Sequence, residues 1–258
     1  AMHLFKDVIA TPSLTYLKVL RSTYESYTQW CVDKGIAKEN NYSNIELADL
    51  NECVFKGNLS FITREDVLKW CSEAENPRDQ FILLALYEGI RGKNYKEIID
   101  LNIADVDFKH KRIFIPSRNG CVEASDELLQ YAKYSYETDD YVREDGIVKK
   151  ISPLPRGSVV RRVNISRSAK EGVNMAPSPR FIYATYVRLT KLLPMDDISV
   201  SFVQECGMID FIRRKAKENN LTVSQYFDSS ECMDDVMCQY DRVLYRSVMW
   251  EKYNDYLK

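Results

Sequence analysis

Asp79–Asp107 reads DQFILLALYEGIRGKNYKEIIDLNIADVD, and this stretch decides the fold. Its apolar beginning predicts a buried helix over Arg78–Glu88 that ends at Gly89, because glycine commonly follows the last helical residue. A second, short helix is expected at Lys96–Leu101. The residues after it, Ile103–Phe108, predict the first strand of a hairpin.

The segments on either side of this stretch predict more helix and little more strand. Arg112–Pro116 is expected to be the second strand, joined to the first by Lys109-His110-Lys111, and Asn119-Gly120 predicts the next turn. Thr63, with Asp66 three residues later, predicts a capped helix to about Glu73. Further helices are expected at 123–136, 178–193, 201–219, 222–227 and 232–257, with long loops over 145–178. The fold class is therefore mainly α with a small antiparallel β-sheet.

Residues 4–58 predict a separate small helical unit. Ser13–Lys34 carries apolar side chains at helical spacing, and a shorter helix is expected around Ile45–Val54. Gly57-Asn58 has the composition of a linker. We therefore expect two domains, residues 1–58 and residues 59–258, which suits a chain of 258 residues.

The composition is that of a folded globular chain, with 45% hydrophobic and 29% charged residues. No run of about 18 apolar residues is present, so no membrane-spanning helix is expected. No signal stretch is found at the N-terminus, which predicts a cytoplasmic location. The seven cysteines lack zinc-type spacing, and the only histidines are His3 and His110. This scarcity argues against a zinc hydrolase or a Ser-His-Asp enzyme, and no metal or cofactor is expected.

The net charge of −2 hides an uneven distribution. Between Lys149 and Lys191 the chain carries ten basic residues and one acid, Glu171, so this window is +9 and the rest of the chain is −11. Such a run is often only a solvated surface. Most of these residues are arginines, however, and arginine binds phosphate with two parallel hydrogen bonds. The window therefore predicts contact with duplex DNA.

The expected helix at 178–193 concentrates part of this charge. Ser178-Pro179 begins it by the usual preferences for the cap and the first turn. The face expected to pack inward consists of Ile182, Tyr186, Leu189 and Leu193. The basic stripe on another face consists of Arg180, Ala184, Arg188 and Lys191. A helix of this kind can contact phosphates or enter the major groove.

The order of elements around Gly89-Ile90-Arg91 resembles the tyrosine recombinase (phage integrase) family. The matching elements are the apolar helix, this tripeptide, the short helix after it and the hairpin that opens with Asp105-Val106-Asp107. The similarity covers most of residues 60–245. Residues 4–58 stand where the family has its DNA-clamping, core-binding (SAM-like) domain. The resemblance implies an integrase catalytic-domain-like fold, with double-stranded DNA as the partner.

The resembled family cleaves DNA with a tyrosine nucleophile, and two arginines, a lysine and two histidine-like donors stabilise the charge that develops on the phosphoryl oxygens. By resemblance, Arg91 takes the place of the first arginine and Tyr240 that of the nucleophile. Ser201 and Gln204 take the places of a histidine and of the second arginine. Glu231 lies near the position of the later histidine or tryptophan.

The rest of the catalytic set has no good match. The hairpin lysine has no clear counterpart, and Arg118 is the nearest basic residue. Tyr240 has acidic neighbours along the chain at Asp228, Glu231, Asp234, Asp235 and Asp241, and carboxylates close to a phosphate would repel it. We therefore expect no catalytic residues: Arg91 and Tyr240 are vestigial, Ser201, Gln204 and Glu231 are degenerate, and Arg91 is kept for phosphate binding.

These residues favour a sequence-specific DNA-binding regulator, a phage or prophage transcriptional repressor in a bacterial host cell that has lost strand cleavage. The residues expected to bind DNA are Arg91, Lys93, Arg118, Arg161, Arg162, Arg167, Lys170, Arg180, Arg188 and Lys191. One alternative is an active site-specific recombinase with an atypical site that uses Tyr240. Another is a protein-interaction adapter without DNA binding. The aromatic-rich segment Val243–Leu257 predicts either self-association through a C-terminal helix or packing within the chain.

Overall fold

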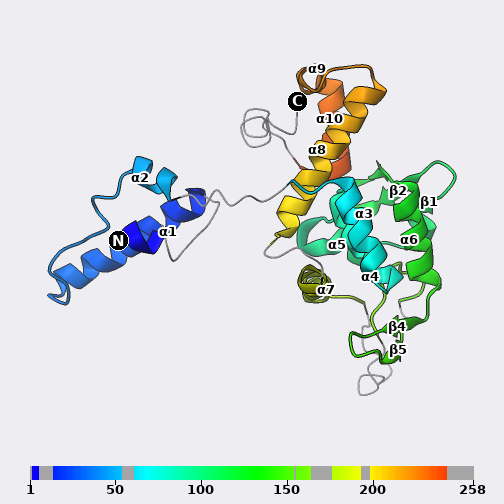
Figure 1. Cartoon of the computed structure of the whole chain (residues 1–258), viewed down its shortest axis with the longest axis horizontal. Helices are drawn as coiled ribbons and strands as arrows, with labels where there is room; N and C mark the ends of the chain where they lie inside the picture. The colour runs from blue at the N-terminus through cyan, green and yellow to red at the C-terminus, as the bar shows by residue number, and fades with distance from the viewer. Residues whose placement is uncertain are drawn as a thin grey trace. The chain divides into compact units, whose positions relative to one another are not determined.

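The structure is a computed structural model that describes residues 2–5, 14–53, 61–153, 155–163, 176–192 and 198–242. It divides into two compact units, residues 1–60 and residues 61–258, each with its own hydrophobic core (Figure 1). Helices make up most of both units, and two small antiparallel sheets lie in the larger one. The predicted fold class is therefore confirmed.

The described part of the smaller unit packs two helices against a small core of its own. α1 (Leu14–Asp33) and α2 (Leu47–Glu52) coincide with the two predicted helices. The core of this unit is made of Phe5, Leu17, Ile45, Leu50 and Cys53, with Tyr24 and Tyr42 packed against it. The rings of these two tyrosines stack with their centroids 5.4 Å apart.

The larger unit is built around α4 (Pro77–Tyr87), which is buried on nearly every side, as its apolar sequence predicts. It packs against α3 (Arg64–Glu73), α6 (Asp126–Glu137), α7 (Pro179–Leu192) and α8 (Val200–Glu218). The capping box predicted for α3 is present, because Asp66 N–H donates to Thr63 Oγ1 while the Asp66 carboxylate accepts the Thr63 N–H.

A three-stranded antiparallel sheet follows the short helix α5 (Lys96–Asp100). Its strands, in the order β1-β2-β3, are β1 (Val106–Asp107), β2 (Arg112–Ile115) and β3 (Gly120–Glu123).

Two predictions in this region were wrong. The first half of the predicted strand Ile103–Phe108 is a 3-10 turn over Ile103–Asp105, which a capping box between Asn102 and Asp105 stabilises. The helix predicted to begin at residue 123 begins at Asp126 instead, because β3 occupies residues up to Glu123 and the Ser125 hydroxyl caps the helix.

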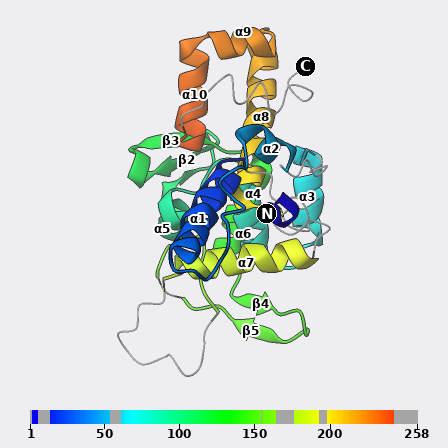
Figure 2. The same cartoon turned by 90° about the vertical axis from the view of Figure 1, so that its left-hand side faces the viewer.

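A second hairpin lies within the region predicted to be loop. β4 (Asp140–Val142) pairs in antiparallel fashion with β5 (Val148–Lys150). All three residues of β5 are exposed, so this strand has no alternation of apolar and polar side chains that would mark it in the sequence. Figure 2 shows this hairpin on one side of α7, with α4 on the other side.

The described C-terminal part of the chain forms a helical hairpin of α8, α9 (Val223–Asp228) and α10 (Ser230–Tyr240), seen in Figure 2. The helix predicted at 232–257 is wrong in its extent, because α10 ends at Tyr240 and Asp241 is left-handed with φ 46°. The segment expected to mediate self-association, Val243–Leu257, lies outside the described residues. Within the described ranges, no helix combines the length and apolar character that a membrane span requires.

Candidate nucleic-acid interface

Arg91 lies on a tight loop between α4 and α5. Four positions of the loop have positive φ: Gly89 at 96°, Gly92 at 63°, Asn94 at 57° and Tyr95 at 59°. A Cβ at Gly92 would lie 2.6 Å from Cγ of Glu97, so glycine is needed for Glu97 to lie against the loop. The Glu97 carboxylate accepts the Arg91 backbone N–H at 2.8 Å. The loop therefore fixes the backbone from which the Arg91 side chain projects.

The Arg91 guanidinium faces the first turns of α8. Its Nη1 donates to Gln204 Oε1 at 3.0 Å and to Ser201 Oγ at 3.4 Å. Its Cζ lies 5.5 Å from the centre of the Tyr95 ring. These groups are neutral, and within the described part of the chain no carboxylate pairs with the Arg91 side chain. Among the described residues, the positive charge is thus oriented by neutral partners and paired with no carboxylate, which suits the binding of an anion.

A surface hollow of about 410 Å³ opens beside Arg91. It is lined by Arg91, Gly92, Lys93, Asn94, Ser201, Gln204, Tyr240, Asp241 and Arg242. The structure thus brings together four of the residues that the resemblance points to, from α4–α5, α8 and α10. Arg242, which pairs with Glu205 at 3.1 Å, was missed because no sequence motif marks it.

The remaining residue of that set, Glu231, does not line this hollow. It is exposed in the first turn of α10, nine residues before Tyr240 and about 13 Å away along the helix axis. Of the five acids expected to surround Tyr240, only Asp241 lines the hollow. The others lie farther along α9 and α10, because a helix moves chain neighbours apart along its axis. The expectation of five carboxylates crowding this site was therefore wrong.

Tyr240 is packed into the core at the end of α10. Its side chain is only 6% exposed, its ring meets Phe211 edge to face at 5.9 Å, and its hydroxyl donates to the Tyr87 carbonyl at 3.1 Å. Burial raises the pKa of Tyr240 well above its ordinary value. In this arrangement the hydroxyl stays protonated and is used as a donor.

Two glycines make this close packing possible. A Cβ at Gly89, where φ is 96°, would lie 2.5 Å from the Gln239 carbonyl oxygen and 2.8 Å from Cδ1 of Tyr240. A Cβ at Gly207 would lie 1.9 Å from the Tyr87 carbonyl oxygen. No larger residue fits at either position without moving backbone. The C-terminal end of α4 is therefore enclosed between α8 and α10.

Arg118 clamps the same end of α10. Its Nε and Nη2 bind the Glu97 carboxylate at 2.6 and 2.5 Å, and its Nη1 donates to the carbonyls of Cys238 at 2.9 Å and Gln239 at 2.8 Å. Its Nη2 also donates to the Gly89 carbonyl at 2.8 Å. The predicted DNA contact at Arg118 is not supported by this placement, because the side chain is 9% exposed and its donors are occupied.

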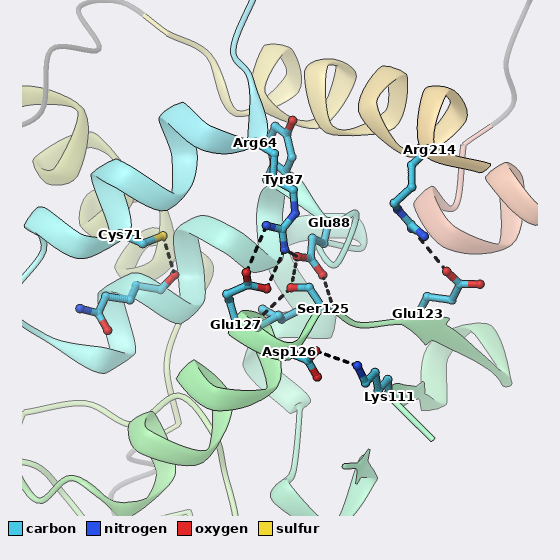
Figure 3. A network of polar contacts seen from close by, with 12 residues as sticks. Arg64, Cys71, Tyr87, Glu88, Lys111, Glu123, Ser125, Asp126, Glu127 and Arg214 are labelled. Carbon is cyan, nitrogen blue, oxygen red and sulfur yellow. Dashed lines mark hydrogen bonds and ion pairs between the residues drawn. The ribbon is translucent and has the colours of Figure 1, made fainter. Parts of the chain in front are cut away.

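A second network lines a hollow of about 470 Å³ to which Tyr240 also contributes. Figure 3 shows Arg64, Glu88, Ser125 and Glu127 pointing toward one another. Arg64 pairs with Glu127 at 2.9 Å and with Glu88 at 3.5 Å, and Ser125 donates to Glu88 through its N–H and its hydroxyl. Burial raises the pKa of Glu88, and the Ser125 bonds and Arg64 offset part of that rise. This network joins α3, α4 and the start of α6.

Two further arginines predicted to bind DNA are held by internal partners. Arg161 is 7% exposed and donates to the carbonyls of Tyr136 and Thr138 at 2.5 and 2.9 Å. Arg188 pairs with the fully buried Asp79 at 2.5 Å, which ties α7 to α4. We therefore assign both side chains to the fold rather than to a surface for DNA.

Besides Arg91, four of the predicted cations have no ion pair among the described residues, and these are the free cations. Lys93, Arg162, Arg180 and Lys191 form no ion pair with any described residue. Arg180 and Lys191 lie on the outward stripe of α7, which also carries Tyr183 and Ala184. Ile182, Tyr186 and Leu189 are buried as predicted, and Val187 packs against the core. Leu193, Arg167 and Lys170 lie outside the described residues. Because α7 contacts Lys93–Tyr95, the stripe adjoins the Arg91 loop.

Comparison with known proteins assigns the larger unit to a protein family. No curated protein matches the sequence. The crystal structure of XerA recombinase is similar at 12% sequence identity with a TM-score of 0.47, over 90% of this chain and 81% of that one. Residues 61–240 match the family described as MrpR, C-terminal catalytic domain, and this match covers more than half of the chain. The chain therefore belongs to the MrpR C-terminal catalytic domain family, a tyrosine-recombinase-like family.

Proposed function

We propose that this protein is a sequence-specific regulator that binds double-stranded DNA and does not cleave it, as a phage or prophage transcriptional repressor would. The observation that carries the proposal is the arrangement of cations without counter-charges. Among the described residues, Arg91 has only neutral side-chain partners, and Lys93, Arg180 and Lys191 have no ion pair. Unpaired cations along one face provide the electrostatic part of DNA binding.

Three features support binding without cleavage. The Tyr240 hydroxyl is buried and donates to the Tyr87 carbonyl, so it is not presented as a nucleophile. Ser201 and Gln204 place neutral groups beside Arg91, where transition-state stabilisation would need further cationic or acidic donors. Arg118, the nearest basic residue on the hairpin, is held by Glu97 and by the end of α10.

Fluorescence anisotropy with a labelled duplex of about 30 base pairs tests the binding half of the proposal. We expect affinity to fall steeply with salt between about 50 and 300 mM, because counterions are released from several phosphates. Arg180→Glu is expected to abolish binding while the thermal unfolding curve stays unchanged.

Lys217→Glu is the matched control, since Lys217 is also exposed but lies sixteen residues beyond Ser201 on α8. A flat salt dependence, or equal effects of the two charge reversals, would contradict the proposed interface. Failure to bind any duplex at low salt would favour the protein-interaction adapter instead.

A nicked suicide substrate tests the absence of cleavage. We expect no covalent protein–DNA band on a denaturing gel. A band that disappears in Tyr240→Phe would establish the alternative, an active recombinase with an atypical site. The regulatory role is tested by mapping binding sites across the genome of a bacterial host, where sites overlapping promoters are expected.

A further inference from the structure

Tyr183 stands on the outward stripe of α7 between two free cations. Its side chain is 53% exposed, and its hydroxyl has no hydrogen-bond partner among the described residues. Tyr186, three residues later on the same helix, is only 2% exposed and donates to the Ile198 carbonyl at 2.7 Å. The structure thus uses one tyrosine of α7 in the core and leaves the other, with its hydroxyl, facing solvent.

The spacing of the free cations on α7 is matched to a groove of DNA. Arg180 and Lys191 are eleven residues apart, which is about 16 Å along the helix axis. The major groove of B-DNA is about 12 Å wide, so long side chains at these two positions can reach phosphates on opposite sides of it. The exposed residues Tyr183 and Ala184 lie between them and would face the base edges.

The neighbours of Tyr183 favour contact with bases rather than with phosphates. Ala184 is small, and Arg188, the charged residue of the stripe between the two cations, is paired with Asp79, so the middle of the stripe offers no unpaired charge. An aromatic ring can pack on the C5-methyl group of thymine, and a hydroxyl can bond to an acceptor on a base edge. Phosphate contacts set affinity and orientation, whereas contacts of this kind carry sequence information.

We propose that Tyr183 is a base-reading residue that determines specificity, with its ring against a thymine methyl group and its hydroxyl on a base acceptor in the major groove. This inference rests on the proposed DNA binding and names the residue that would make it sequence-specific. It assigns different roles to three side chains of one helix: Arg180 and Lys191 for phosphates, and Tyr183 for bases.

Selection of duplexes from a random pool, followed by anisotropy on the selected and a scrambled duplex, tests this inference. Tyr183→Ala is expected to lose the preference at one or two adjacent base pairs and to weaken binding to the selected duplex about 5- to 100-fold. Its affinity for the scrambled duplex and its salt slope are expected to stay unchanged. Tyr183→Phe is expected to keep the thymine preference.

Arg180→Ala is the matched control. It is expected to weaken binding to both duplexes equally and to lower the salt slope by about one. If Tyr183→Ala selects the wild-type motif with wild-type affinity, or lowers both affinities and the slope as Arg180→Ala does, Tyr183 does not read bases. If the wild-type protein binds no duplex at all, the proposed function fails, and that result is distinct from either of these.

Discussion

Two groups of cations in this chain look alike in sequence and differ completely in their surroundings. Arg118 and Arg161 are nearly buried and Arg188 is partly buried, and each is held by carbonyl or carboxylate oxygens from distant segments. Lys93 and Lys191 are exposed and pair with no described carboxylate. The first group holds the fold together, and the second is the group that we propose for DNA binding.

The comparison shows why a charge count overstates a binding surface. A guanidinium whose donors already bind internal oxygens cannot bind a phosphate without breaking those bonds. The +9 window therefore contains fewer cations available for DNA than its sequence suggests. Of the cations in the window without a described ion pair, Arg180 and Lys191 lie on α7, and Arg91 and Lys93 lie on the loop that α7 contacts.

Removal of a clamp residue is expected to give the largest effect. Arg118→Ala leaves the Glu97 carboxylate, 1% exposed, without its ion pair, so the free energy of unfolding should fall by about 3–5 kcal/mol. Urea denaturation followed by circular dichroism measures this. Lys93→Ala serves as the control and should change stability by no more than about 0.5 kcal/mol. Equal stabilities for the two variants would show that Arg118 contributes no more to folding than the exposed Lys93.

Removal of a free cation is expected to change binding and leave stability alone. Lys191→Ala should weaken duplex binding several-fold and reduce the slope of log Kd against log salt by about one, because one phosphate contact is lost. Anisotropy titrations at several salt concentrations measure both quantities. Lys217→Ala should leave the slope unchanged, and a slope that also stays unchanged in Lys191→Ala would place Lys191 outside the interface.

Tyr240 lines the hollow beside Arg91 and Lys93, and Arg118 holds the end of its helix. We expect its side chain to contribute to stability and not to DNA binding. Tyr240→Phe removes the hydrogen bond to the Tyr87 carbonyl and should lower the unfolding free energy by about 1 kcal/mol. Duplex affinity should be unchanged, because the hydroxyl points into the core. A variant with normal stability but weaker DNA binding would move Tyr240 into the interface.

The smallest effect is expected from the pH dependence of Glu88. Its raised pKa means that the folded state favours the protonated form, and Arg64 and Ser125 offset part of this preference. The stability that Glu88 contributes is therefore fully present below its ordinary pKa and is lost as the pH rises through the raised value. Urea midpoints of the wild type and Glu88→Gln between about pH 4 and pH 8 should diverge as the pH rises. Parallel curves would show that Glu88 titrates as an ordinary surface acid.

Local signals in the sequence predicted the helices of the larger unit well. Thr63 and Asp66 form the expected capping box, α4 precedes Gly89, and Ser178-Pro179 begins α7. These signals act between residues a few positions apart, so the sequence alone contains them. The strands were harder, since β3 to β5 have three or four residues each and depend on pairing with other segments.

The sequence predicted most of the residues that line the candidate site, but not what each side chain binds. The resemblance selected Arg91, Ser201, Gln204 and Tyr240, and these residues do line one hollow. The roles of the arginines could not be predicted, because their partners are far away in sequence. Arg118, for example, meets Gln239 across 121 positions. Only the folded chain shows which donors are already occupied.

The close packing at the end of α10 has a consequence for protein design. Placing a histidine at position 201 and an arginine at position 204 would add donors beside Arg91, yet Tyr240 would still point into the core and donate to Tyr87. The Arg118 clamp and the tight fit against Gly89 hold that end of the helix in place. Such a redesign would increase the affinity of this hollow for a phosphate. Strand cleavage would require a helix end that can detach and present its tyrosine.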